Sequence, residues 1–77
     1  MLIYHYIPVK ENLYSPDIGH YVSFGIRALQ LAEKGWREAT FVSDVSTKIS
    51  FVSNLIRICI KKQLSPIHLL DFIQDSI

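Results

Sequence analysis

The pattern of apolar residues changes its period close to residue 46. Before this point apolar and polar residues alternate in short runs, which is typical of strands with one buried face. From Thr47 to about Lys62, apolar residues recur every three or four positions, as they do along one side of a helix. Strands followed by helices within one short chain indicate an α+β fold, because parallel βαβ units would require the two to alternate.

Three strands are predicted in the first part of the chain, at residues 2–9, 20–32 and 36–45. The first is expected to stop at Pro8, because proline lacks the backbone N–H that a strand donates, and to be followed by a polar link. In the second strand the alternation changes phase, which predicts a bulge around residues 25–28. Residues 33–35 fit a three-residue hairpin loop ending in glycine. The alternation of the third strand places Phe41 and Val45 on the same side.

Two helices are predicted in the second part, with Ser46 as N-cap of the first. Its apolar arc is roughly 200° wide, so it should contact the sheet with one flank and the last helix or a second subunit with the other. Ser65 as N-cap and Pro66 at the first position begin the last helix. The apolar residues on its buried side are Leu69, Leu70, Phe72, Ile73 and Ile77. The predicted fold is therefore an α+β three-stranded antiparallel meander, covered on one face by two C-terminal helices.

Length and composition favour a protein partner. The 77 residues are expected to form a single domain, residues 1–77, with a small interior. Since 49% of the residues are hydrophobic, we expect apolar surface to be left for a partner, most simply a second copy in a two-fold homodimer. Eight Lys and Arg stand against seven Asp and Glu. Nucleic-acid-binding domains usually carry a basic excess, so the charge argues against such a partner.

The sequence predicts a soluble, cytoplasmic protein. A single cysteine, Cys59, excludes an internal disulfide and a thiolate zinc site, and it suits a reducing compartment. The first residues show none of the features of a signal peptide. No apolar run approaches the roughly 20 residues that a membrane span needs, so we expect no membrane partner.

Three segments of the chain carry a resemblance to known proteins: YSPDIGHYVSFGI, VSDVSTK and LSPIHLLDFIQD. From about Tyr14 to Asp75 the chain resembles a small family of uncharacterised proteins from anaerobic Gram-positive bacteria, known as a domain of unknown function. The most specific element is the run of residues 64–69 followed by Asp71 and Asp75. The resemblance implies no activity, cofactor or partner.

His68, Asp71 and Asp75 form a pattern that suggests chemistry. On a helix these three residues share a face. One imidazole and two carboxylates can bind a divalent metal, and a His–Asp pair can orient a general base. A site needs convergence from several elements, however, and the sequence offers no Gly-rich phosphate loop and no nucleophile motif. We therefore interpret the three residues as the polar side of the last helix, and expect no catalytic residue, metal or cofactor. A small metal protein or enzyme centred on His68 is our third hypothesis.

The second hypothesis is a nucleic-acid-associated regulator that uses the hairpin of residues 27–37. The side chains that would contact nucleic acid are Arg27, Gln30, Lys34 and Arg37. If the first two strands pair, His5 and His20 could be neighbours, which is a weak indication of a metal site.

The leading hypothesis is a non-enzymatic interaction or regulatory module that acts through protein–protein contacts and self-associates. Tyrosine and tryptophan dominate interface energetics, and the polar side of the last helix is expected to face outward. The candidate partner-binding surface comprises His68, Asp71, Gln74, Asp75, Tyr4, Tyr6 and Trp36.

Overall fold

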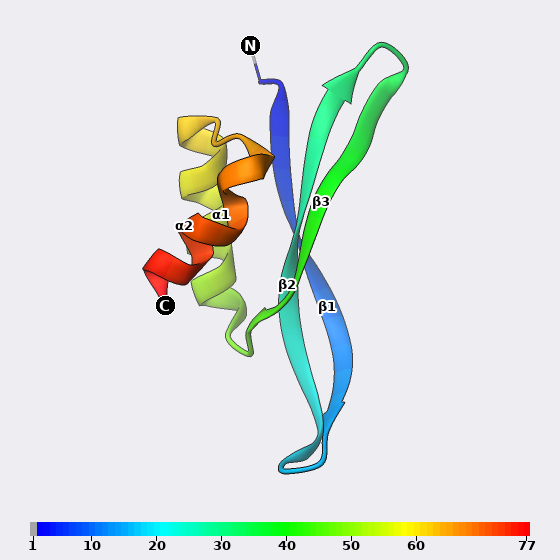
Figure 1. Ribbon diagram of the computed structural model, residues 1–77, viewed down its shortest axis with the longest axis vertical. Helices are drawn as coiled ribbons and strands as arrows, with labels where there is room; N and C mark the ends of the chain where they lie inside the picture. The colour runs from blue at the N-terminus through cyan, green and yellow to red at the C-terminus, as the bar shows by residue number, and fades with distance from the viewer. Residues whose placement is uncertain (1) are drawn as a thin grey trace.

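The computed structural model describes residues 2–77 as an antiparallel three-stranded sheet with helices on one face (Figure 1). The elements are β1 (Tyr4–Ser15), β2 (Gly19–Ala32), β3 (Gly35–Ser46), α1 (Ile49–Lys62), the 3₁₀ turn η1 (Pro66–His68) and α2 (Leu69–Ser76). The predicted α+β class and its order of three strands and two helices are confirmed. The strand order is β1–β2–β3, so β1 and β3 are the two edge strands. Within residues 2–77, no helix is long and apolar enough to cross a bilayer.

Strand β1 is longer than predicted because Pro8 does not interrupt it. The strand continues to Ser15, so the expected stop at Pro8 was wrong. The backbone N–H and C=O of Tyr4 bond to the side chain of Gln63, on the side away from β2. Backbone groups of every second residue in a strand point the same way. The nitrogen of Pro8 therefore also faces the free edge, where no ladder bond is lost.

Strand β3 contains the irregularities of the sheet. Its register against β2 shifts at two places, Phe24/Ile26 and Ala28/Leu29. The bulge was predicted in this part of the sheet, but the extra residues belong to β3 rather than to β2. As a result, Phe41 and Val45 do not share a side as predicted. Phe41 packs against Gly25 on the face away from the helices, whereas Val45 is buried in the core.

Two boundaries also differ from the prediction. The hairpin loop has two residues instead of three, because Gly35, with a φ of +116°, already pairs with Ala32. Ser46 was predicted to cap the first helix, but it still pairs with Phe24 in the sheet. The helix α1 therefore begins only at Ile49.

The core lies between the sheet and the two helices. Its buried residues are Tyr6, Ile26, Ala28, Val45, Val52, Leu55, Ile56, Cys59, Leu69 and Ile73. Ile26 and Ala28 alternate along β2, and the core residues of α1 and α2 follow helical spacing, as the periodicity predicts. The buried arc of α1 is narrower than expected, since Ile49 and Ile58 are exposed. Leu70 and Ile77, predicted on the buried side of α2, are exposed as well.

Candidate functional site

The polar residues of the last helical segment lie on its outer side. His68, Asp71, Gln74 and Asp75 are all exposed. His68 is the last residue of η1 and directly precedes α2. Within residues 2–77, no three side chains of His, Cys, Asp or Glu are close enough together to hold one metal ion.

The aromatic residues of the candidate surface lie elsewhere. Tyr6 belongs to the core with 1% of its surface exposed, and its hydroxyl donates a hydrogen bond to the carbonyl of Leu64. Burial raises the pKa of this hydroxyl to about 12. Tyr4 is half-buried beside the core. Trp36 lies on the opposite face of the sheet, 47% exposed, with its ring 6.0 Å from that of His5. The structure therefore does not bring the seven residues together into one surface.

The remaining histidine and cysteine candidates are also separated. His5 pairs with Leu29, whereas His20 pairs with Tyr14 at the far end of the same two strands, so the interpretation of the two histidines as neighbours was wrong. Cys59 is buried in α1, and this burial raises the pKa of its thiol to about 11. A buried thiol that stays protonated is a poor nucleophile.

One whole face of the sheet carries no helix among residues 2–77, and we call it the open sheet face (Figure 1). The strand register determines which side chains lie on this face. Tyr6 and Ala28 are partners and both point into the core, so the side chains that alternate with them point to the other side. The apolar and aromatic side chains of the open sheet face include His5, Ile7, Val9, Leu13, Leu29, Leu31, Trp36 and Phe41. They are half-buried or exposed. An apolar strip thus runs along the uncovered side of the strands.

A network of polar side chains interrupts this strip. The carboxylate of Glu11 on β1 accepts hydrogen bonds from the hydroxyl of Ser43 and from the backbone N–H of Asp44, both at 2.8 Å. The carboxylate of Asp44 in turn accepts bonds from the hydroxyls of Ser23 and Tyr21, the latter at 2.7 Å. These two hydrogen bonds lower the pKa of Asp44, and the bond to Asp44 raises the pKa of Tyr21.

This network fixes the bulge of β3. Asp44 has a φ of +52°, a conformation that costs free energy for a residue with a side chain. Its backbone N–H and its carboxylate both have partners across the sheet, which holds that conformation in place. The next residue, Val45, is thereby directed into the core. Both carboxylates of the network are engaged in holding the sheet together, which is a structural role.

The hairpin residues considered for nucleic-acid contact do not form one patch. Arg27 makes an ion pair with Glu38 at 2.8 Å and lies 6.0 Å from the ring centre of Phe41, on the open sheet face. Arg37 pairs with Gln30, which lies on the helix-covered side of the sheet. The two arginines are therefore on opposite faces of the sheet.

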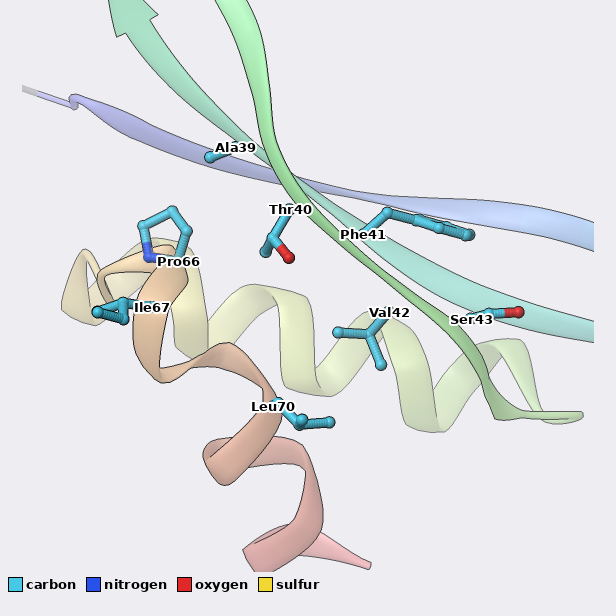
Figure 2. Close-up of a pocket in the computed structure, with 8 residues that line it drawn as sticks. All are labelled: Ala39, Thr40, Phe41, Val42, Ser43, Pro66, Ile67 and Leu70. Atoms are coloured by element: carbon cyan, nitrogen blue, oxygen red, sulfur yellow. The ribbon is translucent and has the colours of Figure 1, made fainter.

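A groove of about 580 Å³ lies between β3 and the last helical segment (Figure 2). Its walls are formed by Ala39, Thr40, Phe41, Val42, Ser43, Pro66, Ile67 and Leu70. Thr40 and Val42 point toward the helical side, whereas Phe41 and Ser43 point away from it. The opposite wall bears Ile67 and Leu70, which are 81% and 52% exposed.

The sequence contained one signal of this groove. Ile67 is an apolar residue among the polar positions of the last helix, and nothing in the amphipathic pattern accounts for it. The other wall could not be anticipated, because the bulges of β3 decide which of its residues turn toward the helices.

Comparison with known families gives one match. The model of a family of unknown function, DUF6514, matches residues 1–77. No curated protein and no solved structure matches the chain.

Proposed function

We propose that this chain, which belongs to the DUF6514 family of unknown function, is a non-enzymatic protein-interaction module that associates with itself. Two observations carry the proposal: one apolar face of the sheet is uncovered, which suits a protein partner, and within residues 2–77 the outer edge of β3 has no neighbouring strand, which suits a second copy (Figure 1). A helix or sheet with an apolar face gains stability by packing that face against another element. The open sheet face has apolar side chains in place and, within residues 2–77, no element of the chain that covers them.

The accessible surface supports the same proposal. It amounts to 5415 Å² for a chain of 8.9 kDa, whereas a compact monomer of this mass exposes about 4,800 Å². The chain is elongated, with extents of 43 × 26 × 19 Å, because the long strands reach beyond the helices at both ends. The excess of about 600 Å² is additional surface that is available to a partner.

We also propose a cytoplasmic location in an anaerobic Gram-positive bacterium. The source is suggested by the resemblance of the three sequence segments to proteins of such organisms. The location is supported by the one cysteine, which is buried and free and so needs no oxidising compartment. Fractionation of cells with an antibody against the native protein tests the location, and recovery in the membrane or the medium contradicts it.

Sedimentation equilibrium of the purified protein tests the proposed self-association. We expect a mass of twice 8.9 kDa at high concentration, falling toward the mass of one chain on dilution. Repeating the measurement at high salt is the control: an interface made by apolar contacts persists, whereas one made by surface ion pairs weakens. A mass of one chain from micromolar to submillimolar concentration overturns the proposal of self-association.

A further inference from the structure

The two edges of the sheet differ in whether another strand can be added. At β1 the amide of Gln63 occupies the free edge, where it bonds to the N–H of Ile3 and to both backbone groups of Tyr4. Further along the same edge Pro8 has no N–H to offer. In the part of the chain that the structure describes, β3 has a neighbouring strand, β2, on one side only. Its other edge borders the groove formed with Pro66, Ile67 and Leu70.

The register shows which backbone groups of β3 face this edge. Tyr4 and Pro8 direct their backbone groups away from β2. The residues opposite them on β2, Gln30 and Ile26, therefore direct their N–H and C=O groups toward β3. Ile26 is one of these partners, and it pairs with Val42 on β3. Val42 therefore bonds toward β2, and the N–H and C=O of the preceding residue, Phe41, point outward.

Resting on the proposed self-association, we infer that two copies join edge to edge through β3, antiparallel and related by a two-fold axis at Phe41. Each Phe41 donates its N–H to the carbonyl of the other, which is the hydrogen-bonded pair of an antiparallel ladder. The result is a continuous six-stranded sheet, with both pairs of helices on the same side.

Side chains on the helix-covered side fit this arrangement. An axis at Phe41 places Thr40 of one copy beside Val42 of the other. Both lie above the groove, so Ile67 and Leu70 of the two copies enclose them. The segments 39–43 and 66–70 contain no Asp, Glu, Lys or Arg. Further out, Glu38 lies opposite Asp44 of the other copy, but both carboxylates already have partners, Arg27 for Glu38 and the hydroxyls of Ser23 and Tyr21 for Asp44. At the centre of the interface no like charges meet.

The open sheet face is the weaker candidate for joining two copies. Its centre contains the carboxylates of Glu11 and Asp44, whose partners are hydroxyls and backbone N–H groups rather than cations. Stacking two such faces brings like charges together and removes them from water, which is unfavourable. In the edge-to-edge dimer this face remains accessible, and it becomes twice as wide.

Substitutions in the groove test the inference. Ile67→Lys and Leu70→Lys place a charge on exposed positions, so the chain should fold, which circular dichroism checks. We expect each to raise the dimer dissociation constant at least about tenfold, because a buried unpaired ammonium is unfavourable. Ile18→Lys is the matched control: it is 68% exposed in the turn between β1 and β2 and should leave the dimer unchanged.

Amide hydrogen exchange tests the pairing itself. Exchange at Phe41 should slow as the protein concentration rises, whereas Val42, already bonded to β2, should not change. Asn12 is the control, since its amide faces the free edge of β1. The edge pairing is overturned if Ile67→Lys/Leu70→Lys dimerises as tightly as the wild type, or if the Phe41 amide exchanges fast in the dimer. Either result leaves the proposed self-association standing. A wild-type protein that stays monomeric overturns both.

Discussion

The side-chain amide of Gln63 bonds to both backbone groups of Tyr4, at 3.0 Å each, although 59 residues separate them in the sequence. It also bonds to the N–H of Ile3 and to the carbonyl of Ile60 in the last turn of α1. The side chain of Gln63 thus bonds to the free edge of β1, as a neighbouring strand would, and also caps the C-terminal end of α1. Gln63 adopts the left-handed conformation at the end of α1, with a φ of 48°, which directs the amide toward β1.

Gln63→Ala should lower the free energy of unfolding by about 1–3 kcal/mol, because these backbone groups lose partners in a partly buried place. Urea denaturation measures the change. The control is Gln74→Ala on the exposed side of α2, expected within about 0.5 kcal/mol of the wild type. Equal stability of the two variants would show that water replaces the amide at no cost.

Gly25→Ala should destabilise the sheet by about 1–3 kcal/mol. A Cβ at this position would lie 2.6 Å from the carbonyl oxygen of Val42 and 3.0 Å from the ring of Phe41. The ring can turn aside, but the backbone of β3 can yield only by shifting away from β2. Gly25→Ala made in a Phe41→Ala background separates the two contacts. If only the ring opposes the new methyl group, Gly25→Ala should no longer lower the free energy of unfolding in that background, which urea denaturation measures.

The stability of the protein should fall in acid partly through Asp44. Hydrogen bonds from Ser23 and Tyr21 lower the pKa of Asp44 in the folded state below its ordinary value of 3.8. The folded state thus binds this proton more weakly, so the contribution is present above about pH 4 and is lost as the pH falls through the folded-state pKa. Urea midpoints measured from pH 7 to pH 2 should fall less steeply in Asp44→Asn than in the wild type. Gln74→Ala, which changes an exposed position of α2 that does not titrate, should follow the wild-type slope.

The thiol of Cys59 should be unreactive in the native protein. Its pKa of about 11 stands against an ordinary value of 9.0, so the thiolate is about a hundredfold scarcer, and burial limits access further. An aromatic disulfide reagent should label the wild type only after denaturant is added. In Cys59→Ala/Ile58→Cys the thiol moves to a position 38% exposed and should react without denaturant. Rapid labelling of native wild-type protein would show that α1 opens readily.

Much of the fold could be predicted because periodicity reports which face of an element is buried. The change of period near residue 46 predicted strands before helices, and the structure confirms it. The extent of β1 could not be predicted, because whether Pro8 ends a strand depends on which edge its nitrogen faces. That direction is set by pairing with β2, which is not a local property.

The sides of β3 were predicted wrongly for a similar reason. Strict alternation puts Phe41 and Val45 together, but the bulge at Asp44 inverts it. The bulge depends on Glu11, which lies 33 residues earlier in the sequence. The candidate surface was likewise assembled from residue types, and a tyrosine such as Tyr6 can be recognised as core only once its partner across the sheet is known.

The bonds of Gln63 have a consequence for how the chain assembles during its synthesis. The hairpin of β2 and β3 joins neighbouring segments and can form early. The amino-terminal end of β1 also needs an amide that is added 60 residues after Ile3. While the chain emerges from the ribosome, the edge groups of Ile3 and Tyr4 therefore bond to water until Gln63, the residue after α1, has been added.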